Sequence, residues 1–328
     1  MSHPESERSI ERLIKLAGGR DMPTAEAMER ARLAAHESWS RMLKQPAVPR
    51  RARLRTMLGF ALAAGIAAFG ILLWTQRPAP AAPELVARIA TLTGDAQLHA
   101  AHAETSARVA LPIHAGTTLA TNEGRVAFTF GDSLSLRIDR HTRLRFDSRE
   151  QVTLLAGALY VDSGGINAVS ALRIETPAGA VRHVGTQFQV HVTGDVTIVR
   201  VREGRVLLTR ASGTPTDIAA GDELRVRGGE LRLQRGLPSF GEDWEWSAGI
   251  APALEIENRP LAEFIAWLAR EHGWQVRYAD ESLQARTFDI RLHGSLDQME
   301  SAAMLERVTL VTGVPLQAGN GVLWVGGK

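Results

Sequence analysis

Apolar and polar residues recur with different periods in successive parts of the chain. Between residues 24 and 43 the apolar residues recur every three or four positions, as on one face of a helix, at Met28, Ala31, Ala35, Trp39 and Met42. From Leu85 to about Leu233 the period is two, which predicts strands, and Gly-, Asn- or Asp-containing turns separate them. Beyond this point helical and strand periods alternate. The pattern therefore predicts a multidomain chain with helical, all-β and α+β parts.

An uninterrupted apolar run, Met57–Trp74, separates the first helical part from the strands. Its 18 uncharged residues, at about 1.5 Å rise each, span roughly 27 Å, close to the thickness of the bilayer hydrocarbon core. Residues 41–56 before it carry six basic and no acidic side chains. The positive-inside rule then places the N-terminus in the cytoplasm. We expect a single transmembrane helix; a cleaved signal peptide and a buried core helix are the alternatives.

These features divide the chain into five predicted regions. Residues 1–56 form a short helical cytoplasmic tail, and 57–74 form the transmembrane helix. Residues 75–84 are a Pro/Ala linker, and 85–235 form an all-β domain, for which sandwich, barrel and solenoid all stay open. Residues 236–328 form a small α+β domain.

The tail is a candidate surface for a cytoplasmic partner. It holds two predicted helices, one with Ile10, Leu13, Ile14 and Ala17 on one face and one that runs from about Thr24 to Leu43. So short a segment buries little apolar area alone, so a docking role and mutual covering of the two helices both stay open. The candidate partner-binding residues are Met28, Leu33, Trp39 and Met42.

Composition excludes some chemistries. The chain has no cysteine, so it has no thiol nucleophile, disulfide or zinc–thiolate site. The pI is about 9.4, but the formal net charge is only +2 and the arginines are spread through strand-like segments. This favours solvated faces over a nucleic-acid stripe, and we expect no direct nucleic-acid binding.

Residues 175–192, ETPAGAVRHVGTQFQVHV, contain the strongest local motif. Pro177-Ala178-Gly179 predicts a turn between two strands, and Gly185 interrupts the second strand as a bulge does. A phosphate loop would need a following helix, and none is predicted. His183 as a ligand is less favoured, because its nearest companion, His191, lies eight residues away.

No other cluster has the spacing of a catalytic, cofactor or metal site. Asp139, His141 and Asp147 fall near predicted turns, as do Asp132 and Glu150, and His99 and His102 stand three apart; all are interpreted as surface residues. We therefore expect no enzyme activity, no cofactor and no metal. Trp244 and Trp246 are interpreted as packing between the β-domain and the C-terminal region, with a ligand or protein contact as the alternative.

The strand pair resembles the FecR family of bacterial transmembrane signal regulators. ETPAGAVRHVGTQFQV, with the later IVRVREGRVLLT, is similar to the family's "TP…G…V…GT.F.V" and "V.V.EG.V" strands, and the similarity extends over about 150 residues. The family-motif residues expected to be structural are Thr176, Pro177, Gly179, Gly185, Thr186, Phe188, Glu203 and Gly204. The apolar motif positions are Val181, Val184, Val190, Val199, Val201 and Val206.

The C-terminal region resembles the small secretin and TonB N-terminal domain, the STN fold. NRPLAEFIAWLAREHG predicts an amphipathic helix ended by Gly273, strands follow at WQVRYA and FDIRLH, and a capping box at Ser295 predicts a second helix. GVLWVG predicts the last strand, which completes a βαββαβ order. The residues similar to the fold are Pro260, Leu261, Ile265, Leu268, Gly273, Gly294 and Ser295.

These resemblances imply a regulator. A FecR-like protein is a single-pass protein of the bacterial inner membrane with most of its mass in the periplasm. The resemblance implies two partners: an extracytoplasmic-function sigma factor on the cytoplasmic side, and the signalling domain of a TonB-dependent outer-membrane transducer, in iron–siderophore or other nutrient uptake, on the periplasmic side. The alternative is a membrane-anchored periplasmic scaffold or ligand-binding module.

Overall fold

The structure, a computed structural model, describes residues 24–43, 84–100, 103–131, 134–164, 172–211, 213–297 and 299–327. The first predicted tail helix and the apolar run Met57–Trp74 lie outside these ranges. Within them, no helix combines the length and the apolar character needed to cross a bilayer. Contacts divide the chain into two units, residues 1–80 and 81–328, and each is described by itself.

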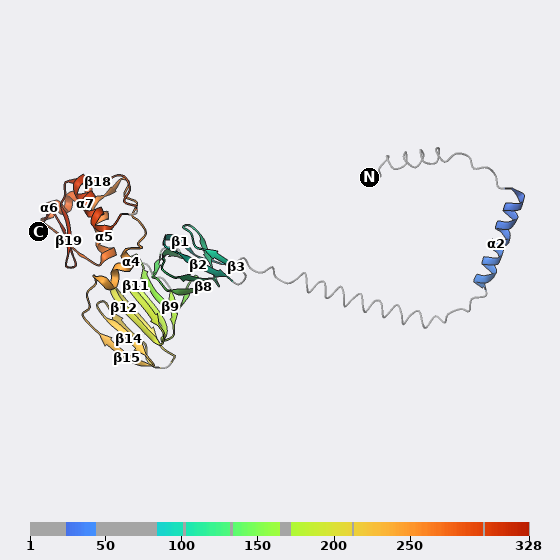
Figure 1. Cartoon of the computed structure of the whole chain (residues 1–328), viewed down its shortest axis with the longest axis horizontal. Helices are drawn as coiled ribbons and strands as arrows, with labels where there is room; N and C mark the ends of the chain where they lie inside the picture. The colour runs from blue at the N-terminus through green and yellow to red at the C-terminus, as the bar shows by residue number, and fades with distance from the viewer. Residues whose placement is uncertain are drawn as a thin grey trace. The chain divides into compact units, whose positions relative to one another are not determined.

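The first unit contains the helix α2, Ala25–Leu43, drawn in blue in Figure 1. The Thr24 carbonyl accepts the first helical hydrogen bonds, from the amides of Ala27 and Met28. This confirms the helix predicted for residues 24 to 43. Most of its described side chains are exposed. Packing within the described part of this unit therefore does not stabilise the helix.

The second unit begins with a β-domain, residues 84–234, whose 15 strands form one folded sheet. Strand pairing separates it into two layers that share three long strands. The first layer contains β1 (Leu85–Thr93), β4 (Pro112–His114), β6 (Arg125–Phe130), β7 (Leu134–Ile138), β14 (Glu223–Arg227) and β15 (Glu230–Gln234). The second contains β2 (Ala96–Ala100), β3 (Ala103–Ser106), β5 (Thr118–Thr121), β8 (Arg143–Ser148), β10 (Arg173–Thr176) and β13 (Thr216–Ala219).

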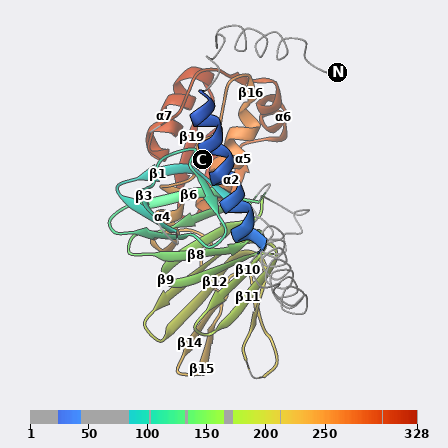
Figure 2. The ribbon, with the colours of Figure 1, turned by 90° about the vertical axis from the view of Figure 1, so that its right-hand side faces the viewer.

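The shared strands are β9 (Gln151–Asp162), β11 (Gly179–Thr193) and β12 (Val196–Thr209), which lie side by side in Figure 2. One half of β9 pairs with β8 and β10, and the other half pairs with β7 and β11. Gly157, Gly185 and Gly204, all with positive φ, stand where these strands pass from one layer to the other. Such glycines allow the sharp local bend that a strand shared by two layers requires.

A single apolar core lies between the layers. Alternate residues of the strands, such as Leu136, Phe188 and Val199, are fully buried in it. Phe128 of the first layer and Phe146 of the second meet edge to face with ring centroids 5.1 Å apart, so the two layers face one another. The all-β prediction is confirmed, and of the three forms left open the strand pairing is that of a sandwich.

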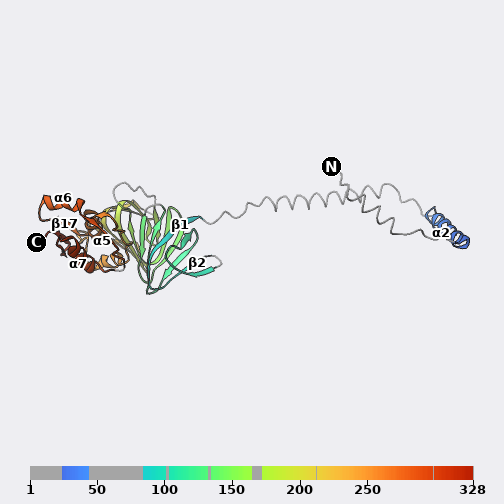
Figure 3. The same cartoon turned by 90° about the horizontal axis from the view of Figure 1, so that it is seen from above.

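The C-terminal lobe, residues 251–327, has its own core and follows the short helix α4 (Glu242–Ala248). Figure 3 shows its helices together at one end of the strands. The strands β17, β20 and β19 form one sheet in that order, and β16 pairs with β18. The elements are β16 (Arg259–Pro260), α5 (Leu261–His272), β17 (Gln275–Tyr278), α6 (Glu281–Asp289), β18 (Arg291–Leu292), α7 (Ser301–Thr312), β19 (Leu316–Gly319) and β20 (Val322–Val325).

The predicted βαββαβ order of this lobe is wrong in three places. Phe288 and Asp289 belong to α6 rather than to a strand, because the Asp280 carboxylate caps that helix by accepting from the Leu283 amide at 2.8 Å. The second helix begins at Ser301, not after Ser295, whose hydroxyl accepts from the Asp297 amide in a local turn. The strand β19 was missed. The helix ending at Gly273 and the last strand are confirmed.

Replacing Gly204 tests the requirement for a bend. A Cβ at this position, where φ is +78°, would lie 2.3 Å from the carbonyl oxygen of Gly185. We expect Gly204→Ala to lower the free energy of unfolding by about 2–5 kcal/mol, because left-handed strain and overpacking add. The matched control is Gly194→Ala, where φ is +58° but nothing lies within 4 Å, and about 1–2 kcal/mol is expected. Urea unfolding measures both; equal losses would contradict the clash.

Candidate functional site

Polar residues gather on the outer face of the first layer, where the C-terminal helices cover it. Because side chains alternate along a strand, residues next to core positions point outward. Arg137 on β7 is only 1% exposed, although it stands between the core residues Leu136 and Ile138. The same alternation places further residues on this face. We call this set the polar platform; it comprises Arg137, Tyr160, Asp162, Gln187, Gln189 and Arg202.

The strand register arranges most of the platform in two rows. Arg137 pairs with Tyr160 across β7 and β9, and Tyr160 pairs with Gln189 on β11. In the second row Asp162 pairs with Gln187, which faces Glu203 on β12. Four neighbouring strands therefore bring side chains that lie up to about 65 residues apart in sequence onto one surface.

Arg202 reaches the platform through an irregularity in β12. The ladder pairs Phe188 with Val201 and Gln187 with Glu203, so Arg202 is the extra residue of a bulge. A second shift in the register occurs on β11 between Val184 and Gln187. This confirms the bulge predicted at Gly185. A bulge redirects the side chain at its extra residue, which here is Arg202.

The end of helix α5 docks on the platform. Arg270 donates to Asp162 through Nη2 at 2.6 Å and to Glu203 through Nη1 at 2.8 Å. Gly273 ends the helix with φ of +69°, and a Cβ there would lie 2.0 Å from the carbonyl oxygen of Ser239. Only glycine therefore allows the helix to end this close to the β-domain.

Glu271 makes the central contact of the junction. Its carboxylate accepts from Nη1 and Nη2 of Arg137 at 2.5 and 2.9 Å, and Arg137 also donates to the Ser247 carbonyl at 2.9 Å. Both side chains are almost completely buried. An acidic residue in the last turn of a helix is normally unfavourable because of the helix dipole. The bidentate pair offsets this effect and joins the sheet, α4 and α5 at one point.

Two tryptophans of α4 close the junction. Trp244 and Trp246 pack edge to face on Tyr160, with ring centroids 6.4 and 6.5 Å away. The Trp246 indole N–H donates to the Gln189 side chain at 3.0 Å, and that of Trp244 donates to the Pro238 carbonyl at 3.2 Å. Figure 1 shows α4 between the strands and the C-terminal helices. The predicted packing role is confirmed for both residues.

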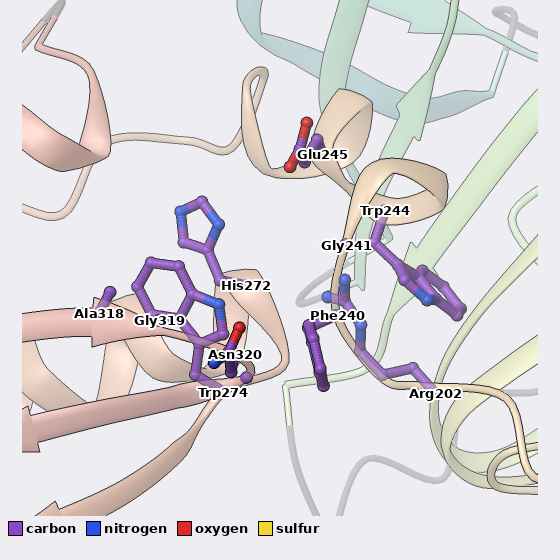
Figure 4. A pocket seen from close by; sticks show the side chains of 11 residues that line it. Arg202, Phe240, Gly241, Trp244, Glu245, His272, Trp274, Ala318, Gly319 and Asn320 are labelled. Carbon is purple, nitrogen blue, oxygen red and sulfur yellow. The ribbon is translucent and has the colours of Figure 1, made fainter.

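A pocket of about 220 Å³ lies where the sheet, α4 and the C-terminal lobe meet. We call it the junction pocket. Figure 4 shows the Arg202 guanidinium and Phe240 on one side and His272 and Trp274 on the other. The His272 ring stacks on Trp274 at 4.2 Å between centroids, and its Nε2 lies 2.7 Å from the Ser301 hydroxyl. The pocket therefore has aromatic walls and one buried cation.

Burial and neighbouring charges set the protonation of the junction. Burial alone would raise the pKa of Asp162, but the hydrogen bonds and charge of Arg270 outweigh it and lower that pKa. Burial lowers the pKa of Arg202, and burial with the nearby Arg202 charge lowers the pKa of His272 to about 4. At neutral pH the His272 imidazole in the wall of the pocket is thus neutral, and Arg202 is the cation of the pocket.

The structure brings together only some of the motif residues. Thr176, Pro177 and Gly179 form the tight turn between β10 and β11, as predicted. Gly185, Thr186, Glu203 and Gly204 form the bulge at the other end, beside the junction, where Glu203 meets Arg270. Phe188 is in the core.

The tail candidates lie in the other unit. Met28, Leu33 and Trp39 are 53%, 61% and 62% exposed on α2. At about 100° per residue, Trp39 lies roughly 20° and Leu33 roughly 140° around the helix from Met28, so Leu33 does not share their face. The side chain of Met42 lies outside the described part.

The residues that sequence reasoning missed are the polar ones of the junction. Arg137, Tyr160, Asp162 and Glu271 stand at solvent-facing positions of their elements, so the pattern gives no reason to bury them. One signal was present: Glu271 in the last helical turn opposes the helix dipole. The surface interpretation holds for Asp139 and His141, which pair with Arg125 and Glu123. Asp132 and His102 lie outside the described ranges, within which no metal-ligand group of three occurs.

Comparison with known proteins identifies the centre of the β-domain. The model of the family described as FecR protein matches residues 117–207, which run from β5 into β12. The chain carries a FecR domain. The FecR domain thus contains all six platform residues, each in one of its strands, and the bulge that places Arg202.

Two solved structures show a slight likeness to the chain. Both are crystal structures described as a proposed anti-sigma factor from Parabacteroides distasonis ATCC 8503. Each is 16% identical to this chain, with a TM-score of 0.34. The alignments cover 64% of this chain and 99% or 98% of the other. At this score the likeness carries no conclusion about fold or function. A search of curated proteins finds no match to the chain.

Breaking the central contact tests its part in joining the lobe to the sheet. We expect Glu271→Ala to lower the free energy of unfolding by about 3–5 kcal/mol, because Arg137 is left buried and unpaired. Glu263→Ala is the matched control on the same helix; its pair with Arg259 is about half exposed, and a loss below about 1 kcal/mol is expected. Urea unfolding followed by tryptophan fluorescence measures both, and a similar loss in both variants would refute the central role.

A buried histidine predicts a pH dependence. Neither ring nitrogen of His183 has a hydrogen-bond partner among the described residues, and burial lowers its pKa to about 4. Between pH 6.5 and 4 the unfolded chain therefore binds a proton that the folded chain does not, so stability falls as the pH falls. We expect His183→Leu to remove about 2 kcal/mol of the loss between pH 7 and pH 5.

The control for this variant is His99→Leu, which replaces a histidine at a strand position that is about half exposed, so an equal effect of both variants would contradict the role of burial at His183. Urea unfolding at both pH values measures the difference. A wild-type pH dependence retained in His183→Leu would mean that His183 is not the titrating group.

Proposed function

We propose that the chain is a single-pass inner-membrane regulator of an extracytoplasmic-function sigma factor. The FecR domain at residues 117–207 is the observation that carries this proposal. The apolar run Met57–Trp74, with its basic N-terminal flank, supports a transmembrane helix that leaves the tail in the cytoplasm and the FecR domain in the periplasm. The helix α2, with two large apolar side chains exposed on one face, supports binding of a cytoplasmic partner.

In this proposal the sigma factor binds the face of α2 that holds Met28 and Trp39. Large apolar residues on a lone helix bury their surface when the helix enters a groove of a partner. Tryptophan is also the residue type most often found at the energetic centre of protein interfaces. Trp39 is therefore the anchor and Met28 a flanking contact.

The periplasmic part, in this proposal, receives the signal. Residues 236–328 form an STN-like domain that, with the FecR domain, contacts the signalling domain of a TonB-dependent outer-membrane transducer, in iron–siderophore or other nutrient uptake. The docking of α5 on the platform supports a response of both lobes together, because Arg270 and Glu271 tie the C-terminal lobe directly to strands of the FecR domain.

The test measures binding between the full-length chain in detergent and purified extracytoplasmic-function sigma factors of the same genome. We expect one sigma factor to bind, and Trp39→Asp and Met28→Asp to weaken it by about 10- to 30-fold, the loss typical of an interface anchor. Leu33→Asp is the matched control on the other side of α2 and should change the affinity less than about 3-fold.

The outcomes separate the alternatives. An equal loss in Leu33→Asp would refute the proposed face but leave the partner in place. If the wild-type chain binds none of the sigma factors, the regulator proposal is wrong and a membrane-anchored scaffold is favoured.

A further inference from the structure

Arg202 is a buried cation without a carboxylate partner. It is 7% exposed, and its Nε and Nη2 make no hydrogen bond to the described residues. Among the described residues, its hydrogen bond is from Nη1 to the backbone carbonyl of Glu271 at 3.0 Å, and the Tyr160 ring centroid lies 5.8 Å from the guanidinium carbon. The guanidinium lies over the Trp244 ring, 4.3 Å from the centroid, which stabilises the charge only in part.

The other cations of the junction are paired. Arg137 takes both oxygens of the Glu271 carboxylate, and Arg270 takes those of Asp162 and one of Glu203. In the described part of the chain no carboxylate forms an ion pair with Arg202. Burying a positive charge without a counter-charge is costly. An anion that binds beside such a charge therefore interacts with it more strongly than it would in water.

The junction pocket has the size and the walls of a site for a small molecule. Its volume of about 220 Å³ exceeds that of cavities of about 150 Å³ that hold a benzene ring. Phe240, Trp244 and Trp274 supply apolar walls. On the side of helix α7 it adjoins a wider apolar hollow that shares His272 and Trp274, which gives a route of entry.

We propose that the junction pocket binds a small organic carboxylate, with its apolar, ring-sized body between the aromatic walls and its carboxylate on Arg202. A guanidinium and a carboxylate match in a planar, bidentate arrangement. The two free nitrogens of Arg202 are covered by neighbouring atoms in this structure. The anion reaches them by a small rotation of the guanidinium, which faces the pocket beside Phe240 (Figure 4).

Two other titratable groups line the pocket. His272 is neutral at physiological pH because burial and the Arg202 charge lower its pKa to about 4, so it does not add a second positive charge. The exposed carboxylate of Glu245 also lines the pocket and repels an anion. A ligand with one negative charge fits this balance better than one with two or three.

The position of the pocket gives binding a consequence for the molecule. Its walls come from β12 of the FecR domain, from α4 and from the C-terminal lobe. A ligand held between them stabilises the docked arrangement of the lobe by mass action. Ligand concentration would then set how firmly the C-terminal lobe is held on the sheet.

Isothermal titration calorimetry on the full-length chain in detergent tests the proposal, with benzoate as the probe and benzamide as its neutral counterpart. We expect benzoate to bind and benzamide to bind at least 10-fold more weakly. Arg202→Gln should lower the benzoate affinity by about 10- to 100-fold, and Arg202→Lys by less. The matched control is Arg277→Gln, which removes a guanidinium over Trp324 outside this pocket and should change nothing.

Glu245→Gln is a second variant at an exposed position, so it tests the site even if the Arg202 variants fold poorly. We expect it to raise the benzoate affinity about 2- to 5-fold, because a repelling charge is removed. Absence of benzoate binding to both wild type and Glu245→Gln would overturn the site. Equal affinity for benzoate and benzamide would overturn the role of Arg202, and inorganic phosphate binding as tightly as benzoate would overturn the ring-sized body.

Discussion

The ion pair between Arg137 and Glu271 is the contact on which the arrangement of this molecule depends. Removing two charges from water costs several kcal/mol each, and the structure recovers this only where the geometry satisfies both groups. Here the guanidinium meets both carboxylate oxygens and the Ser247 carbonyl. Few other placements of α5 on the sheet would satisfy the pair. The pair therefore selects one orientation of the C-terminal lobe more than it adds net stability.

The bulge at the FecR motif serves the same junction from the side of the sheet. Gly185 and Gly204 bend the two longest strands, and this lets both strands belong to two layers. The same irregularity sets Glu203 against Arg270 and turns Arg202 toward the pocket. The motif whose glycines bend the strands thus also positions the charged side chains of Glu203 and Arg202. The bend in the strands and the docking of the helix are parts of one geometric arrangement.

Sequence reasoning could predict what depends on local pattern. The strands with alternating apolar residues, the turn at Pro177, the bulge at Gly185 and the helix ended by Gly273 all follow from period and turn chemistry, and the structure has them. Sequence reasoning failed where the structure of a segment depends on its contacts with other parts of the fold. Ser295 has the sequence of a helix cap, but its side chain serves a turn, and α7 begins later.

The sequence contains signals for two elements of the C-terminal lobe that the predicted order lacks, α6 and β19. Asp280 before an acidic first turn is a cap signal for α6, and Asn320-Gly321 is a hairpin signal for β19 and β20. The platform had no such signal. A strand whose outer face carries Arg137 or Asp162 has the same pattern whether water or a helix covers it. Only the fold, by bringing Arg270 and Glu271 opposite these residues, makes burial possible.

Charge balance links the junction to its proposed ligand. Among the described residues of the junction, Arg137 and Arg270 meet carboxylates, while Arg202 meets one carbonyl and the rings of Tyr160 and Trp244. A protein selected only to hold its lobes together gains nothing from an unpaired buried cation, since an apolar residue of similar size would pack on Trp244 at lower cost. An anion that arrives from outside removes that penalty only while the lobe stays docked. The unpaired charge therefore couples occupancy of the pocket to the arrangement that the ion pair selects.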